Sequence, residues 1–310
     1  MDLSIVIVSW NVRDLLEACL RSIYAKTRGL SFEVFVVDNA SADGSPEMVE
    51  QSFPQVQLIC NAANVGFARA TNQALRLSKG RYVLLLNPDT VILDEALVQM
   101  VRFADENPDI GALGPKVLTA QGEVDMRCAR RFPSLLSEFF ELTRLSYRFP
   151  RNRLLGSYLM SYWDHNDSRE VEVLMGACML VRREAMEQVG LLDEAFYMYG
   201  EDVEWCYRLK RAGWRIWYDS EARIVHLGGQ STKLIREEMG LERFRSRYTF
   251  FRKHRGPLYA GAYKALMLLI TLAKQVIFAV RAIISRDEGQ RRRYRDKVRL
   301  HGKVLRWVLS

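Results

Sequence analysis

Apolar residues in the first third of the chain follow two alternating spacings. Apolar runs predict four strands, at residues 3–8, 33–37, 57–60 and 82–86, of which the first is consistent with a buried strand. Apolar positions three and four apart predict helices between and after them, at residues 14–24, 66–78 and 94–106. This alternation is typical of β-α-β units. It predicts an α/β fold with a mainly parallel central sheet and helices on both faces.

The pattern becomes less regular in the middle of the chain. Residues 133–170 have no clear period, and we expect an inserted, partly helical excursion there. Apolar residues return at 171–181. Helical spacing over 201–212 ends at a glycine, and two apolar runs predict short strands at 214–218 and 223–227.

The composition is that of an ordinary globular protein. Of the 310 residues, 49% are hydrophobic and 26% are charged, which allows one large domain or two average ones. The five cysteines are widely spaced without a C-x-x-C pair, which argues against a disulfide framework or a structural zinc site and favours a reducing cytoplasm. No basic segment precedes the first apolar run, so we expect no cleaved secretory signal.

The charge is distributed unevenly along the chain. The net charge is +8, yet residues 243–310 hold 18 Lys and Arg against three acids, so the rest of the chain is mildly acidic. Such a basic tail on a soluble body favours a polyanion or a membrane surface as its partner.

The tail itself has a pattern that favours a membrane surface. Its longest uncharged run, 265–273, is shorter than the roughly 20 residues that a bilayer span needs. Within 258–284 the polar side chains gather on one arc of a helix, which predicts an interfacial amphipathic helix, and the basic cluster after residue 290 suits anionic lipid. The alternative is a helix that packs on the body of the protein or on the second subunit of a homodimer.

Two aspartates stand where predicted parallel strands end. Asp38 closes the second strand, and Asp89 follows the fourth strand through Asn87 and Pro88. Ligands of such sheets bind beyond the carboxyl ends of the strands, where a carboxylate accepts hydrogen bonds from a sugar or base, or ligates a hard cation. Asn, Pro and Asp also form turns, so an ordinary strand-end turn is the alternative for either site alone.

Two polar loops add further candidates for ligand binding. Residues 39–45 are dense in turn formers, and residues 61–66 lead into a helix whose first backbone amides could meet a phosphate or a ribose. The chain has neither a G-x-G-x-x-G nor a G-x-x-x-x-G-K-[ST] motif, which disfavours a Rossmann dinucleotide fold and a P-loop.

An acidic pair, Glu201 and Asp202, begins the last helix of the predicted body. Acids at this position often only complement the helix dipole. Here an aromatic run at 196–199 precedes them, which suits a saccharide-binding floor, and one carboxylate could act as general base toward a hydroxyl. His226, in a glycine-rich turn, is either a metal or phosphate ligand or an ordinary hydrogen-bonded histidine.

Seven short motifs in this chain occur in a characteristic order. They are Val6-Ile7-Val8-Ser9-Trp10-Asn11, Val37-Asp38-Asn39-Ala40-Ser41-Ala42-Asp43-Gly44-Ser45, Asn64-Val65-Gly66-Phe67-Ala68, Leu86-Asn87-Pro88-Asp89, Gly176-Ala177-Cys178-Met179-Leu180, Glu201-Asp202-Val203-Glu204 and His226-Leu227-Gly228-Gly229. In this order they resemble glycosyltransferase family 2, the inverting GT-A enzymes, over residues 3–255. The resemblance extends to the bacterial rhamnosyltransferase-like subgroup, which assembles O-antigen, cell-wall and other cell-surface polysaccharides.

The resemblance implies a role for each motif. Asn87 to Asp89 would replace the D-x-D motif of the family, so that Asp89 and His226 hold a divalent cation, Mg²⁺ or Mn²⁺, with one carboxylate fewer than usual. Asp202, with Glu201 beside it, would be the general base. The remaining residues would bind the nucleotide-sugar, and with Asn87 they are Ser9, Asn11, Asp38, Asn39, Asp43, Asn64, Gly66 and Gly176.

The implied fold is the GT-A nucleotide-diphospho-sugar transferase fold over residues 1–255, followed by amphipathic helices over 256–310. Residues 1–120 would form the donor half and 121–255 the acceptor half. The implied reaction moves a sugar, best L-rhamnose from dTDP-rhamnose, to a hydroxyl of a polyprenyl-linked or other glycan acceptor. We expect an enzyme that lies on the inner face of the bacterial cytoplasmic membrane through residues 258–310.

Two other classes of protein share part of this pattern. A sugar nucleotidyltransferase would carry a loop rich in Gly, Arg and Lys after the first strand, where Ser9-Trp10-Asn11 stands instead. A nucleic-acid-binding protein would explain the basic tail, but the acidic body has no recognisable reading module, so we expect no nucleic-acid partner.

Overall fold

The structure, a computed structural model, describes residues 1–228 and 236–309, and two sheets contain its strands. The strands are β1 (Leu3–Ser9), β2 (Phe32–Asp38), β3 (Gln57–Cys60), β4 (Tyr82–Leu86), β5 (Thr90–Ile92), β6 (Ile110–Leu118), β7 (Ala129–Arg130), β8 (Arg169–Glu170), β9 (Val173–Leu174), β10 (Cys178–Arg182) and β11 (Arg215–His226). The nine-stranded sheet has the order β3-β2-β1-β4-β10-β6-β11-β5, with β8 paired to β11. The two-stranded sheet pairs β7 with β9.

The N-terminal half of the large sheet is parallel. β1 pairs in parallel with β2 and with β4, and β2 pairs in parallel with β3. Every residue of β4 is buried, because its apolar side chains face helices on both sides of the sheet. β6 and β11 form a further parallel pair, whereas β10, β5 and β8 run antiparallel to their neighbours. The predicted α/β fold is therefore confirmed, with a mixed sheet.

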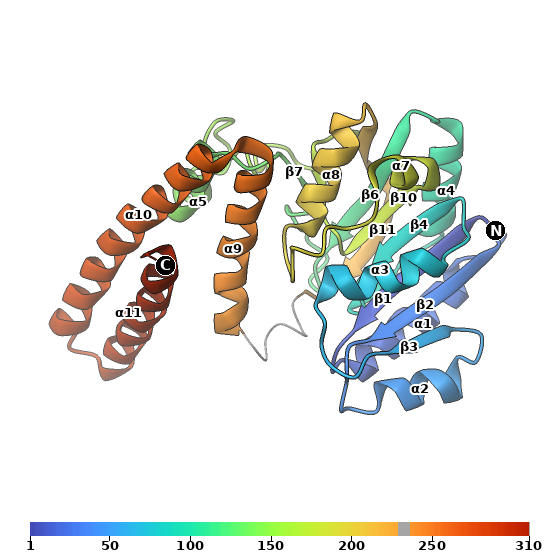
Figure 1. Cartoon of the computed structure of the whole chain (residues 1–310), viewed down its shortest axis with the longest axis horizontal. Coiled ribbons are helices and arrows are strands. Elements are labelled where there is room, and N and C mark those ends of the chain that lie inside the picture. Colours follow the sequence, from blue (N-terminus) through green and yellow to red (C-terminus); the bar gives the residue numbers. More distant parts are fainter. Residues whose placement is uncertain (229–235, 310) are drawn as a thin grey trace.

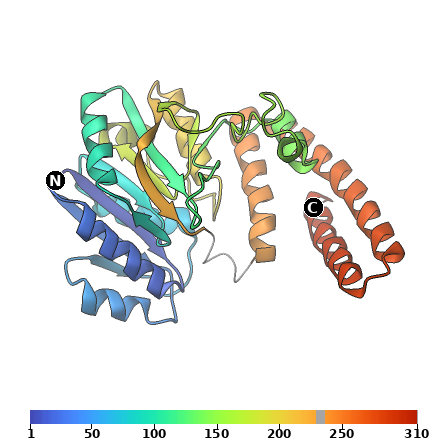
Figure 2. The ribbon, with the colours of Figure 1, turned by 180° about the vertical axis from the view of Figure 1, so that it is seen from behind.

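Helices cover both faces of this sheet. The helices of the described chain, with and without contact to the sheet, are α1 (Arg13–Lys26), α2 (Ser45–Ser52), α3 (Phe67–Leu77), α4 (Ala96–Glu106), α5 (Leu135–Leu142), α6 (Leu145–Arg148), α7 (Arg183–Val189), α8 (Glu201–Arg211), α9 (Arg236–Arg255), α10 (Pro257–Ile284) and α11 (Glu288–Leu309). Figure 1 shows α3, α7 and α8 in front of the sheet, and Figure 2 shows α1 and α4 on the opposite face. The last three helices extend away from the sheet, on the side remote from the N-terminus (Figure 1).

Two features of the sheet differ from the pattern in the sequence. The two short strands expected at 214–218 and 223–227 are one strand, β11, whose register shifts between Asp219 and Arg223. The polar residues at this shift interrupt the apolar pattern without ending the strand. β6 was not predicted, because Gly111 and Gly114 interrupt its apolar run. A Cβ at Gly111 would lie 2.6 Å from Cβ of Trp214, so that glycine makes room for a neighbouring side chain.

The C-terminal helix α10 is longer than the uncharged run in its sequence. It continues through its lysines for 28 residues with a mean hydropathy of 2.0 over its most apolar window, so length and composition would allow it to cross a membrane. This corrects the expectation of a segment too short to span, since a charge ends an uncharged run but not a helix. Its polar arc faces the protein: Thr271 is buried, and Lys264 Nζ lies 5.2 Å from the ring centroid of Tyr248 on α9.

Candidate active site

The predicted site residues lie at one edge of the large sheet. Ser9 ends β1 and is the register partner of Asp38, which ends β2. Asn87 follows β4, and His226 ends β11 opposite Thr90 of β5. The sequence motif that contains His226 continues to residue 229, which lies outside the described residues. Carboxyl ends of β1, β2, β4 and β11 thus converge, as the position of ligand sites in open α/β sheets requires.

The end of β2 presents buried polar atoms without a partner. Asp38 Oδ2 accepts a hydrogen bond from the Ser41 amide at 2.8 Å, but its Oδ1 has no partner within the described part of the chain. Ser9 Oγ, on the adjacent strand, is also buried and has no partner there. Buried polar atoms are almost always hydrogen-bonded, so this pair of orphaned oxygens points to a ligand.

The loops after β2 and β3 are joined by asparagine side chains. Asn39 Oδ1 accepts a hydrogen bond from Asn61 Nδ2 at 2.9 Å, and Asn39 Nδ2 donates to Asn64 Oδ1 at 3.3 Å. Asn64 Oδ1 also accepts from the Gly66 amide at 3.0 Å and from the Tyr197 hydroxyl at 3.3 Å. These bonds hold the two loops and the residue before α3 in one arrangement.

Position 66 requires glycine for two reasons, its backbone conformation and the close approach of a neighbouring side chain. Its φ is 87° and its ψ 166°, a region that residues with a Cβ rarely adopt. A Cβ there would lie 2.6 Å from Cδ2 of Tyr197. Phe196, the first residue of the aromatic run at 196–199, is buried in the core and cannot contact a saccharide, so the expectation of a saccharide-binding floor is wrong for this residue. Tyr197 and Tyr199 are exposed.

The side chains of Asn11, which is partly buried, and Asp43, which is exposed, form hydrogen bonds within the loops beside Asp38. Asn11 Oδ1 accepts from the Ala42 amide at 2.8 Å. Asp43 Oδ2 accepts from the amide of Arg13 at 2.8 Å, and its Oδ1 accepts from the Ser45 hydroxyl at 2.6 Å. Both side chains therefore shape the loop beside Asp38, and a direct contact with a nucleotide stays a prediction.

Asp89, His226 and Asn87 form a compact set of candidate metal ligands. His226 Nε2 lies 3.2 Å from Asp89 Oδ1 and 3.3 Å from Asn87 Nδ2. Both Asp89 and His226 are buried. A carboxylate oxygen beside an imidazole nitrogen is a donor set that suits Mn²⁺ or Mg²⁺ in part, and diphosphate oxygens could complete it. Within 1–228 and 236–309, no group of three or more His, Cys, Asp or Glu side chains could hold a metal.

The acidic pair lies at the start of α8, after Gly200. Asp202 Oδ2 accepts from Arg130 Nη2 at 2.5 Å and from the Gly176 amide at 3.3 Å. Glu201 is buried beside it, and its Oε2 has no partner within the described residues. Burial, and then the charge of Asp202, raise the pKa of Glu201 to about 8. This shift favours the protonated form of Glu201 at neutral pH.

A short backbone segment joins the acidic pair to the candidate metal ligands. The amide of Gly176 donates to Asp202, and the carbonyl oxygen of Ala177 accepts from the Asn87 amide at 2.9 Å. Asn87 in turn lies beside His226. The two groups of side chains, drawn from three separate parts of the sequence, thus flank one dipeptide at the edge of the sheet.

The sequence pattern does not identify three charged residues near the site, Asp125, Arg127 and Arg130. Arg130 binds Asp202. Asp125 is buried, which raises the pKa of its carboxyl, but the hydrogen bonds and the charge of Arg127 outweigh this effect and hold the pKa below its ordinary value. No spacing rule marks these residues, because they lie in an irregular segment between β6 and the insertion. Only their three-dimensional contacts identify them.

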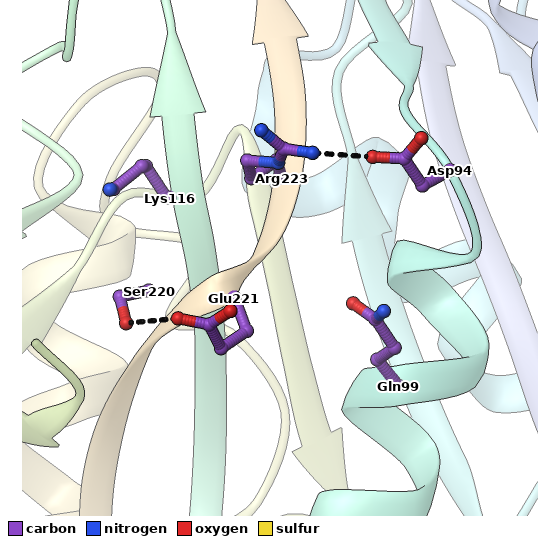
Figure 3. Close-up of a pocket in the computed structure, with 6 residues that line it drawn as sticks. All are labelled: Asp94, Gln99, Lys116, Ser220, Glu221 and Arg223. Carbon is purple, nitrogen blue, oxygen red and sulfur yellow. Dashed lines mark hydrogen bonds and ion pairs between the residues drawn. The ribbon is translucent and has the colours of Figure 1, made fainter. Parts of the chain in front are cut away.

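A separate cavity lies away from this edge. Its volume is about 400 Å³, and Figure 3 shows its lining residues, Asp94, Gln99, Lys116, Ser220, Glu221 and Arg223. Arg223 pairs with Asp94 at 2.8 Å, and Ser220 donates to Glu221 at 3.3 Å, so these groups satisfy one another. None of the predicted site residues lines this cavity.

Residues 2–243 match the family model described as glycosyltransferase like family 2. The chain is 32% identical over 241 residues to the N-acetylglucosaminyl-diphospho-decaprenol L-rhamnosyltransferase of Mycobacterium tuberculosis. The matched segment covers 74% of this chain and 77% of that protein. It is 27% identical over 214 residues to the low-salt glycan biosynthesis hexosyltransferase Agl10 of Haloferax volcanii, which covers 68% of this chain and 62% of the relative.

A solved structure shows the same fold over nearly the whole chain. The mannosyltransferase PcManGT of Pyrobaculum calidifontis, in complex with GDP-Man and Mn²⁺, has a TM-score of 0.58 at 18% identity. The similarity covers 98% of this chain and 84% of that one.

Proposed function

The chain belongs to glycosyltransferase family 2 and has the GT-A fold, and from this premise we propose that it transfers L-rhamnose from dTDP-rhamnose to a hydroxyl of a polyprenyl-linked glycan, with inversion. That it is a glycosyltransferase decides against the nucleotidyltransferase and nucleic-acid-binding alternatives. The observation that supports the proposal best is the position of Asp202 and Asn87 on either side of Gly176 and Ala177.

The nucleotide of the donor would lie over the ends of β1 and β2. The orphaned oxygens of Asp38 and Ser9 are free to bond to a base or a ribose, and the asparagine network around Asn39 and Asn64 borders them. The M. tuberculosis relative is named as an L-rhamnosyltransferase that acts on a diphospho-decaprenol-linked sugar, which supports rhamnose and a lipid-linked acceptor for this chain. The dTDP carrier rests on the family resemblance.

The diphosphate of the donor would lie beside Asp89 and His226. These residues would hold a divalent cation together with diphosphate oxygens, since two protein side chains leave coordination positions open. When bound, such a cation neutralises the negative charge of the nucleoside-diphosphate leaving group. Asn87 contributes an amide where an acid would add a second carboxylate, so this site depends on the diphosphate for much of its affinity.

Asp202 would act as the general base. A sugar hydroxyl is a poor nucleophile at neutral pH, and a positioned carboxylate that takes its proton contributes about 10²–10⁴-fold to the rate. Burial raises the pKa of Glu201 and favours its protonated form, so Glu201 is the poorer candidate for the base. One base with direct displacement predicts inversion at the anomeric carbon.

The acceptor and the C-terminal helices suggest a membrane surface. Apolar side chains of α10 are exposed along one stripe, with Leu269 at 68%, Val276 at 63% and Ile283 at 80% exposure. Exposed arginines and a lysine of α11 lie on the helix packed beside it, at 292, 293, 295, 297 and 299. An apolar stripe flanked by cations suits the headgroup region of an anionic bilayer. We therefore place the enzyme on the inner face of the bacterial cytoplasmic membrane.

The test is a transfer assay with a matched binding measurement. Isothermal titration with dTDP-, UDP- and GDP-sugars, with and without Mg²⁺ or Mn²⁺, should select dTDP-rhamnose and show tighter binding with metal. Asp202→Asn should abolish transfer and leave donor affinity within about twofold, because it removes the base but not a donor contact. Transfer at the native rate by this variant would refute the base assignment.

A further inference from the structure

Two arginines are buried in the acceptor half, and neither lies in a family motif. Arg130 of β7 exposes 14% of its side chain and donates to Asp202 Oδ2 at 2.5 Å. It also donates to the hydroxyl of Tyr158 at 3.4 Å. Arg247 of α9 exposes 11% of its side chain.

Tyr158 connects the two arginines. Its hydroxyl accepts a hydrogen bond from Arg247 Nη2 at 2.7 Å, and the Arg247 guanidinium carbon lies 5.2 Å from the centre of its ring. Burial raises the pKa of Tyr158, but the charges of Arg247 and Arg130 outweigh this effect and lower the pKa below its ordinary value. Arg247 Nε also pairs with Glu138 Oε1 at 2.8 Å.

These contacts form a continuous buried network of hydrogen bonds and ion pairs that starts at the candidate base. It runs from Asp202 on α8 through Arg130 and Tyr158 to Arg247 on α9, and ends at Glu138 on α5. The network contains two cations, Arg130 and Arg247, and two anions, Asp202 and Glu138, so its charges balance. Removing one member would leave a buried charge without its partner, which is costly.

We propose that Arg130 is a positioning residue for the Asp202 carboxylate, and that Tyr158, Arg247 and Glu138 fix Arg130 in turn. This inference rests on the proposed role of Asp202 as base. The planar guanidinium of Arg130 presents several N–H groups in a fixed fork, so it can bind a carboxylate and a tyrosine hydroxyl at once, which a lysine ammonium does less well. These contacts thereby tie the orientation of the base to the insertion, through Tyr158 and Glu138, and to α9, which packs against α10, the helix with the proposed membrane stripe.

The obvious alternative is an ion pair that only stabilises the fold, and a pH profile distinguishes the two. The charged and titratable groups around Asp202 are Arg130 from β7, and Glu201 and Cys206 from its own helix. A neighbouring cation favours the ionised form of a carboxylate. Losing Arg130 should therefore move the acid limb of kcat to higher pH, which a loss of stability alone would not do.

The experiment compares Arg130→Met, Arg130→Lys and a control arginine in the full-length enzyme. Arg182→Met is the matched control, because Arg182 is also partly buried and donates to the backbone carbonyls of Ala104 and Ile110. We expect Arg130→Met to lower kcat about a hundredfold, the scale of a base displaced by about an ångström, and to leave the calorimetric Kd for dTDP-rhamnose unchanged. Arg130→Lys should recover part of kcat and return the acid limb toward the wild-type pH.

Each outcome decides the proposal. An unshifted acid limb for Arg130→Met, or a loss of kcat no greater than that of Arg182→Met at equal melting temperature, would overturn it. If Arg130→Met does not fold, Tyr158→Phe replaces it as the test variant. A kcat of Tyr158→Phe equal to that of the wild type would then overturn the proposed network. A native transfer rate for Asp202→Asn would instead overturn the proposed base, which keeps the two failures distinguishable.

Discussion

Replacing Gly66 by alanine should weaken both the fold and donor binding. The added Cβ would lie 2.6 Å from Cδ2 of Tyr197 and 2.8 Å from the carbonyl oxygen of that residue. Real Cβ atoms essentially never approach so closely, and the carbonyl cannot rotate aside, because it accepts a hydrogen bond from the Phe67 amide at 2.8 Å. Tyr197 must therefore shift, and with it the hydroxyl that donates to Asn64.

A second glycine separates the two costs of this change. Gly256 precedes α10 with a φ of 88° and a ψ of 169°, nearly the values of Gly66, and a Cβ there would meet nothing within 4 Å. Both alanine variants bear the backbone strain, about 1–3 kcal/mol. Only Gly66→Ala adds the overlap with Tyr197, about 1–3 kcal/mol for an overpacked site. Its loss of stability should therefore exceed that of Gly256→Ala by roughly the overlap term.

Chemical denaturation of both variants measures these free energies, and calorimetric titration with dTDP-rhamnose measures the donor Kd. We expect the Kd to rise only for Gly66→Ala, because the asparagine network beside Asp38 loses the support of Tyr197. Equal stability losses for the two glycines, together with an unchanged Kd for Gly66→Ala, would refute the reasoning.

Three further predictions concern the proton, the metal and the membrane. Because the folded pKa of Glu201 is raised from 4.5 to about 8, the folded state holds an extra proton, so stability should fall as pH rises between these values. Glu201→Gln should remove this fall in melting temperature measured from pH 5 to 8. His226→Gln should weaken Mn²⁺ binding to the dTDP-loaded enzyme at least tenfold by calorimetry, and unchanged affinity would contradict its role. Val276→Lys with Ile283→Lys should reduce sedimentation with phosphatidylglycerol vesicles more than tenfold, whereas Leu77→Lys, at an exposed position on α3, should not.

The sequence predicts the N-terminal half of the fold well, because the central parallel strands β1, β2 and β4 are mostly buried and read as nearly continuous apolar runs. β4 at Tyr82–Leu86 and β3 at Gln57–Cys60 begin and end where the pattern predicts. The sequence pattern does not predict a strand whose apolar run is interrupted by residues that close packing requires. β6 contains glycines that admit Trp214 and Leu174, so its apolar run looks broken.

The placement of the candidate site residues was predictable where one local motif contains them. Asp38, Asp89, Asp202 and His226 all stand at the ends of predicted elements, and the structure brings them to one edge of the sheet. Arg130 could not be found in this way. It lies 72 positions from Asp202 along the chain, in a two-residue strand, and no periodicity records such a contact.

The C-terminal helices show why length and hydropathy alone do not decide how a helix meets a membrane. A helix that spans a bilayer alone would present apolar side chains on every side. In α10, by contrast, the arc with Lys264 and Thr271 packs against protein, and Lys264 Nζ lies 5.2 and 5.6 Å from the rings of Tyr248 and Trp307. The partner helix α11 is too basic to enter hydrocarbon. On α10 the stripe through Val276 stays exposed, so the proposed membrane contact is best made by a helix pair that lies on the membrane surface, with the catalytic edge of the sheet in the aqueous phase.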